Sequence, residues 1–160
     1  MQIVVECFVE APPDVAFAAA TDVSNWPRFI SGIQGVAMLT PGPVAMGTSF
    51  RETRIMFGRQ ATEEMTFAEI EPPHRFVLTA FNHGTAYHAE HTFAADARGT
   101  RMRLAFEGQP STLVSRLFAP LGRLFAGTVQ RQLEADLADL KHEAERRYRE
   151  RSAGPRQGPI

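Results

Sequence analysis

Hydrophobic and polar residues alternate along the first two-thirds of the chain in a pattern that predicts β-strands. Over residues 3–9, apolar side chains recur at every second position and Glu6 faces the other way, as in a half-buried strand. A proline pair ends this strand, and Asp14 then falls in the first turn of a short helix, where its charge complements the helix dipole. A second short helical turn is expected at Trp26–Pro27.

Six further strands are predicted, separated by turns that contain Gly or Pro. They span residues 33–40, 47–57, 60–70, 75–82, 85–95 and 100–107. Short strands joined by such turns favour an antiparallel meander.

From residue 111 the apolar spacing changes from two to three or four, which predicts a helix that ends near residue 150. At 1.5 Å per residue this helix would be about 60 Å long, longer than a domain of this size is wide. A kink is therefore expected at Pro120 and Gly122, which weaken the helix backbone. Residues 151–160 lack periodicity and are predicted to form a loose tail.

Composition narrows the class of protein. The chain has 160 residues, which suits one domain, assigned here to residues 1–150. A net charge of -1 gives no basic surplus for nucleic-acid binding. Cys7 is the only cysteine, and neither a signal peptide nor a spanning helix is evident, so we expect a soluble, cytoplasmic protein. The excess of Phe, 12 against 2 Tyr and 1 Trp, favours a dense core or an apolar pocket wall.

The turns also predict which side chains share a face of the sheet. A two-residue turn at Gly58–Arg59 would place Arg54 opposite Glu63, and it would gather on one face Phe50, Glu52, Arg54, Met56, Ala61, Glu63, Met65 and Phe67. A turn at His83–Gly84, continued through Gly99, adds to that face Phe76, Leu78, Ala80, Tyr87, Ala89, His91, Phe93, Met102, Leu104 and Phe106. We interpret this face as the apolar lining of a cavity with five polar groups, which are Glu52, Arg54, Glu63, Tyr87 and His91.

The order of elements and several motifs resemble the START-like helix-grip superfamily (SRPBCC), which includes polyketide cyclases and dehydratases and lipid-transfer domains. The resemblance covers residues 2–148, and the segments that carry it are 11–17, 22–29, 47–48, 71–75, 99–101 and 136–141. It implies an α+β fold in which a seven-stranded curved antiparallel sheet wraps around a long C-terminal helix, with two short helices between strands 1 and 2. It also implies a ligand cavity between sheet and helix.

The polar residues of the predicted cavity allow more than one role. Arg54 with Glu52 and Glu63 could orient the polar end of a ligand, or Arg54 and Glu63 could form a cross-strand ion pair that only fixes register. His91 and Tyr87 are candidate catalytic residues for proton transfer, although a core histidine bonded to its neighbours explains His91 equally simply. No metal or cofactor is expected, because His88 and His91 point to opposite faces of one strand.

The helical segment 113–125 is strongly apolar apart from Arg116 and Arg123. We expect its apolar face to pack as core against the sheet, with Leu121 and Phe125 completing the wall of the ligand cavity. A peripheral contact with a membrane surface and a homodimer interface remain as alternatives.

Three functions fit these features. The first is a carrier or sensor of a hydrophobic small molecule, such as a lipid, a quinone or a polyketide-like compound. The second is a cofactor-independent enzyme similar to the polyketide cyclases and dehydratases, and the sequence leaves open whether the protein is an enzyme. The third is a protein-interaction module with a filled core.

Overall fold

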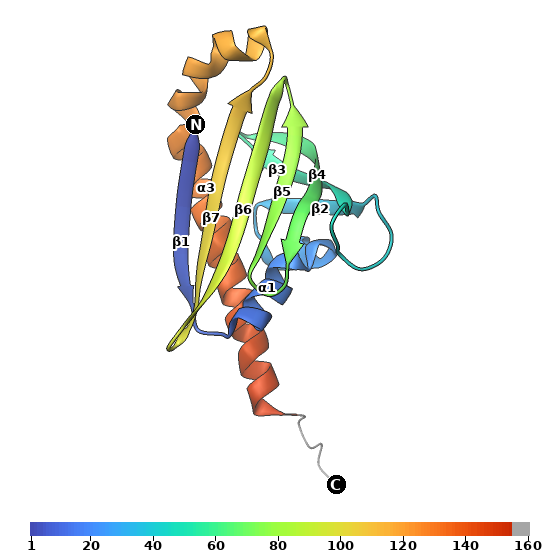
Figure 1. Cartoon of the computed structure of the whole chain (residues 1–160), viewed down its shortest axis with the longest axis vertical. Coiled ribbons are helices and arrows are strands. Elements are labelled where there is room, and N and C mark those ends of the chain that lie inside the picture. The colour runs from blue at the N-terminus through green and yellow to red at the C-terminus, as the bar shows by residue number, and fades with distance from the viewer. Residues whose placement is uncertain (155–160) are drawn as a thin grey trace.

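The computed structural model describes residues 1–154 and contains one seven-stranded antiparallel sheet that curves around a C-terminal helix (Figure 1). The strand order is β1-β7-β6-β5-β4-β3-β2. The strands are β1 (Gln2–Val9), β2 (Ile33–Met38), β3 (Ser49–Met56), β4 (Arg59–Glu71), β5 (Arg75–Asn82), β6 (Thr85–Asp96) and β7 (Gly99–Pro110). The helices are α1 (Pro13–Thr21), the 3-10 turn η1 (Val23–Asn25), α2 (Trp26–Phe29) and α3 (Leu113–Ala153). The predicted helix-grip fold is confirmed.

Two hairpin turns set the register of the sheet. The β5–β6 turn is at His83–Gly84, as predicted, and it pairs Asn82 with Thr85. Both turn residues have positive φ, which gives the twist that two-residue hairpins require.

The β3–β4 turn lies one residue earlier than the sequence predicted, at Phe57–Gly58 instead of Gly58–Arg59. Like Gly84, Gly58 takes the second turn position, where a positive φ costs glycine nothing. The predicted pairing of Arg54 with Glu63 is therefore wrong: Arg54 faces Ala61, and Glu52 faces Glu63. The error is two positions in register, so every side chain stays on its predicted face.

A dense core fills the end of the grip where α1 and α2 lie. Phe50, Phe67 and Phe76 are fully buried in it. Phe17 of α1 packs edge-on against Phe76, with 5.9 Å between ring centroids, and Trp26 packs edge-on against Phe50 at 5.5 Å. Each buried side chain of this size contributes about 1.5–3 kcal/mol of hydrophobic stabilisation, so this end of the molecule is the main source of stability.

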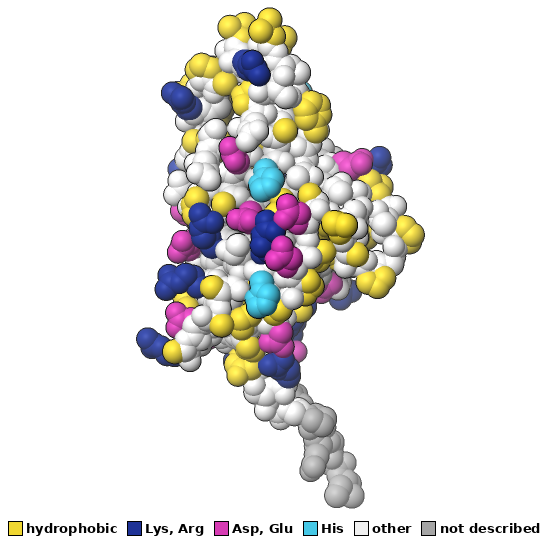
Figure 2. Space-filling model, viewed as in Figure 1, with side chains coloured by type: hydrophobic (Ala, Val, Ile, Leu, Met, Phe, Trp, Pro, Cys, Tyr) yellow, Lys and Arg dark blue, Asp and Glu magenta, His cyan; other side chains and the backbone are white. Residues whose placement is uncertain are grey.

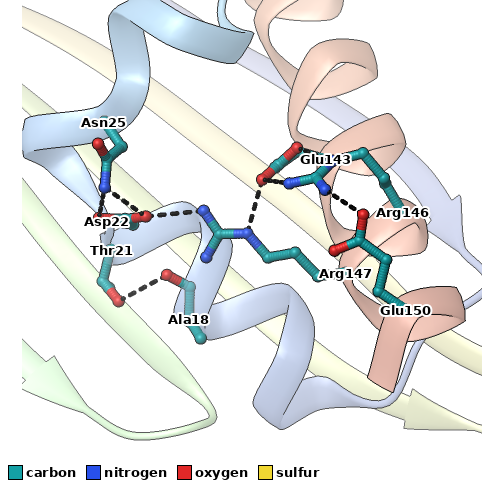
Figure 3. Close-up of polar contacts among 8 residues, drawn as sticks. All are labelled: Ala18, Thr21, Asp22, Asn25, Glu143, Arg146, Arg147 and Glu150. Carbon is teal, nitrogen blue, oxygen red and sulfur yellow. Dashed lines mark hydrogen bonds and ion pairs between the residues drawn. The ribbon is translucent and has the colours of Figure 1, made fainter. Parts of the chain in front are cut away.

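An ion pair fastens the C-terminal half of α3 to Asp22, the residue between α1 and η1 (Figure 3). The Arg147 guanidinium donates to Asp22 at 2.7 Å and to Glu143 at 2.7 Å, and it lies over the Phe29 ring. Arg146 also donates to Glu143. These hydrogen bonds, Arg146 first, hold the pKa of the Glu143 carboxyl below its ordinary value. The network therefore ties this half of α3 to Asp22 and to Phe29 of α2.

The start of α3 is fixed to the β5–β6 turn. Thr112 and Ser115 form a capping box, with 3.1 Å between the Ser115 backbone nitrogen and the Thr112 hydroxyl oxygen. Ser111 and Ser115 also donate hydrogen bonds to the Gly84 carbonyl. From there the first turns of α3 lie beyond the end of β7 and turn toward the β1 edge before the helix runs down behind the sheet (Figure 1).

The helix α3 is continuous over 41 residues with Pro120 inside it, and Figure 1 shows it bending within its first turns. The helix extends to Ala153, three residues beyond the predicted end; of the predicted tail, residues 155–160 lie outside the described residues. The prediction that segment 113–125 packs as core is wrong, because Leu117 and Leu124 are each 76% exposed. The capping contacts hold the start of this segment at the β5–β6 turn, and the apolar side chains that follow stay largely exposed.

Candidate ligand-binding site

The concave face of the sheet has a packed end and an open end. At the packed end the predicted lining residues are buried in the core, and these are Phe50, Phe67, Phe76, Leu78, Phe93, Met102 and Leu104. At the open end the inward side chains are only partly buried, and these are Met56, Ala61, Glu63, Met65, Ala80, Tyr87, Ala89 and Phe106. The concave face is therefore less fully covered at the open end than at the packed end.

Phe125 marks one border of this open end. Its ring lies 5.0 Å from the ring of Phe57, at the tip of the β3–β4 hairpin. Leu121 and Phe125 are each about half exposed, so they stand at the rim and not in a closed wall.

A buried polar cluster lies where β3 meets the middle of α3. Arg54 donates from Nη1 to Asp136 Oδ2 at 3.0 Å and from Nε to Glu52. Glu52 is only 4% exposed. Burial raises the pKa of the Glu52 and Asp136 carboxyls, and the charge of Arg54 only partly opposes it. Two carboxylates share one guanidinium, so the cluster favours an additional proton or hydrogen-bond donor.

Glu63 extends this cluster across the sheet. It faces Glu52 in the strand register and accepts a hydrogen bond from Asn82 at 3.2 Å. Beyond it, Tyr87 stacks on Phe106 with 5.8 Å between ring centroids. Burial, followed by the charge of Glu63, raises the pKa of the Tyr87 hydroxyl, so this hydroxyl remains a hydrogen-bond donor at neutral pH.

His91 lies deeper, at the packed end. It stacks on Phe76 at 4.4 Å, and its Nδ1 is buried without a hydrogen-bond partner. Burial lowers the pKa of His91 to about 4, so the ring is neutral at pH 7. Tyr87 and His91 are four residues apart on β6, or about 13 Å at 3.3 Å per residue. The structure does not bring this predicted proton-transfer pair together.

Sequence reasoning missed two residues of the cluster, Asp136 and Asn82. Asp136 is one turn of α3 away from apolar positions that face the sheet, but the local pattern contains no sign of its bond to Arg54, 82 residues earlier. Asn82 ends β5 and reads from the sequence as an ordinary turn residue.

A separate hollow of about 790 Å³ lies against the outer face of the sheet. Most of its lining comes from outward positions, which are Glu64, Thr66, Thr79, Phe81, Ala86, His88, Glu107 and Gln109; Ala80 and Tyr87, which alternate to the concave face, complete it. Figure 2 views this outer face, where charged side chains of both signs gather. The charged and polar side chains of Glu64, His88 and Glu107 stand in this lining beside Phe81, so it mixes polar and apolar groups.

Within residues 1–154, no group of three or more His, Cys, Asp or Glu side chains is arranged to hold a metal ion. In the same part of the chain, every helix is too short or too polar to cross a bilayer.

Fold and site together define a helix-grip protein with an open-ended concave face. Residues 1–145 match the family described as polyketide cyclase / dehydrase and lipid transport, and the chain belongs to this family. Among curated proteins, none matches the sequence.

Solved structures share the fold at low sequence identity. The aromatase/cyclase Zhui from Streptomyces sp. R1128 is 19% identical, with a TM-score of 0.78 and coverage of 96% of this chain and 98% of that one. TTHA0849 from Thermus thermophilus is 16% identical, with a TM-score of 0.72 and coverage of 97% and 100%. The di-domain aromatase/cyclase StfQ from the steffimycin biosynthetic pathway is 14% identical, with a TM-score of 0.73, and the match covers 91% of this chain and 51% of StfQ. At these identities the likeness concerns the fold alone.

Proposed function

We propose that the protein binds a hydrophobic small molecule between the open end of the sheet and α3, as a carrier or sensor. The observation that carries the proposal is a half-buried apolar surface that ends at the buried Glu52–Arg54–Asp136 cluster. A lipid, a quinone or a polyketide-like compound has the matching chemistry, since each combines an apolar body with oxygen atoms at one end.

Arg54 and its two carboxylate partners would recognise the oxygen-bearing end. The two bonds to Glu52 and Asp136 use only part of the five N–H donors of a guanidinium, so further donors remain for a ligand carbonyl or carboxylate. The carboxyls, with their raised pKa values, complement a ligand hydroxyl. Hydrogen bonds to charged groups contribute about 1.5–3 kcal/mol, which corresponds to roughly a 10- to 150-fold change in affinity.

The experiment is a titration of the purified chain with a long-chain fatty acid and with a quinone, followed by intrinsic fluorescence. We expect Arg54→Met to weaken binding at least tenfold. Arg51→Met is the matched control, because Arg51 is on the same strand but points outward, with its side chain 56% exposed. The double variant Glu52→Gln/Arg54→Met repeats the test with one buried charge fewer. Equal affinities for all four proteins would contradict polar recognition at this cluster.

A second candidate is a cyclase or dehydratase, and it is favoured by Arg54, Glu63 and Tyr87 standing along one open-ended face. Arg54 would polarise a carbonyl, Glu63 would accept a proton and Tyr87 would donate one. The fold shared with two aromatase/cyclases supports this candidate as well. It predicts that Tyr87→Phe lowers turnover of a polyketide-like substrate at least 100-fold and leaves its binding unchanged, whereas a carrier shows no turnover. The third hypothesis, a protein-interaction module, requires a filled core, and only the packed end of the concave face has one.

A further inference from the structure

The first turns of α3 expose a large apolar surface. Seven residues of this surface are between 49% and 86% exposed: Leu113, Val114, Leu117, Phe118, Leu121, Leu124 and Phe125. At 100° per residue they fall within an arc of about 140° around the helix axis. Soluble monomers rarely leave so many neighbouring apolar side chains in water, which indicates that something covers this face.

The opposite side of the same turns carries Ser115, Arg116 and Arg123, of which only Ser115 is partly buried. Ser115 donates to the Gly84 carbonyl at 2.9 Å, which anchors this side of the helix to the β5–β6 turn and leaves most of the apolar arc in water. Arg116 and Arg123 also lie outside the apolar arc. A helix with one wide apolar side and basic residues on the other has the form of a helix that lies in a membrane interface.

The charge of this region has one sign. Between residues 108 and 133 there is no acidic residue, whereas Arg116, Arg123 and Arg131 are basic. Figure 2 shows hydrophobic and basic side chains at the end of the molecule where α3 begins, with the acidic ones further along. Phe57, which is 56% exposed and touches Phe125, enlarges the apolar surface from the β3–β4 hairpin.

We propose that the protein docks on an anionic lipid bilayer through the apolar face of residues 113–125, with Phe57 beside it. Anionic headgroups supply the negative charge that this region lacks, worth about 1 kcal/mol for each Lys or Arg near the surface. A second copy of the chain fits less well, because its own residues 108–133 contain no acidic side chain to pair with Arg116 and Arg123. The docked surface adjoins the open end of the concave face, so a hydrophobic ligand would pass between bilayer and protein over a short path.

The test is co-sedimentation of the full chain with vesicles of phosphatidylcholine alone and of phosphatidylcholine mixed with phosphatidylglycerol, without added ligand. We expect stronger binding to the anionic vesicles, and a loss of at least tenfold in the partition coefficient for Leu117→Asp/Leu124→Asp. Arg116→Gln/Arg123→Gln should remove most of the preference for anionic vesicles. Met46→Asp is the control, since Met46 is 73% exposed but lies in the loop between β2 and β3.

Two results would overturn this proposal. One is vesicle binding that neither lipid charge nor the Leu117/Leu124 substitutions change. The other is a wild-type protein that elutes as a dimer from a sizing column while the Leu117→Asp/Leu124→Asp variant elutes as a monomer, which would assign the face to a second copy. Circular dichroism checks that each variant is folded. Because the assay uses no ligand, its outcome is independent of the binding function proposed above.

Discussion

Replacing Arg54 with methionine tests whether the polar cluster is as buried as the structure indicates. The substitution leaves Glu52 and Asp136 without their shared counter-charge. Removing one partner of a buried ion pair costs about 3–5 kcal/mol. Because burial raises the pKa of both carboxyls, protonation relieves part of this cost. We expect Arg54→Met to lower the free energy of unfolding by about 3 kcal/mol at pH 7. Arg51 points outward, and its ion pair with Glu64 is exposed to water. Arg51→Met should therefore lower the free energy of unfolding by less than about 1 kcal/mol.

The pH dependence of stability gives a second, independent test of Arg54→Met. In Arg54→Met the folded state holds protons on Glu52 and Asp136 more tightly than the unfolded state does, so its free energy of unfolding should rise as the pH falls from 7 to 5. Urea denaturation of wild type, Arg54→Met and Arg51→Met at both pH values measures this. The double variant Glu52→Gln/Arg54→Met should recover part of the loss. The reasoning is refuted if Arg54→Met costs no more than Arg51→Met and its stability is the same at pH 5 and pH 7.

Two further substitutions test the packed end. Glu143→Gln should lower the free energy of unfolding by about 1 kcal/mol at pH 7, since it weakens the pairs with Arg146 and Arg147. Because the folded pKa of Glu143 is depressed, the loss should shrink as the pH falls through that pKa, and a loss that stays constant in urea titrations would contradict this. His91 has a folded pKa of about 4, below its unfolded value, so wild type should lose up to about 3 kcal/mol between pH 6.5 and pH 4 through this residue. His91→Phe should remove that slope, and an unchanged slope would show that His91 is not buried neutral.

The sheet could be predicted from the sequence because its signals are local. Alternation of apolar residues assigned the strands, and glycine in the turns placed the hairpins. The predicted turn at His83–Gly84 places glycine second, and its register is correct. The predicted turn at Gly58–Arg59 places glycine first, and its register is shifted by two positions. Since side chains alternate with a period of two, the inward residues of β3 and β4 were still predicted correctly.

The rest of the site depends on contacts that the local pattern does not contain. The bond between Arg54 and Asp136 joins residues 82 positions apart. The apolar stripe over residues 113–125 has the same spacing whether it covers a core or faces outward. Its exposure follows from where the strands end and from the anchoring of Ser115 to Gly84, which only the folded chain reveals.

The central claim is that the open end of the concave face holds a hydrophobic molecule. Native mass spectrometry of the wild type, Ala80→Trp and Ala86→Trp tests it most directly. Ala80 points inward between Met65 and Tyr87, so tryptophan would fill the open end, whereas Ala86 points outward on the next strand. The account predicts a one-to-one complex with an apolar compound in wild type and Ala86→Trp, and none in Ala80→Trp. A bound compound retained by Ala80→Trp, or none in any of the three even after incubation with fatty acids and quinones, would contradict it.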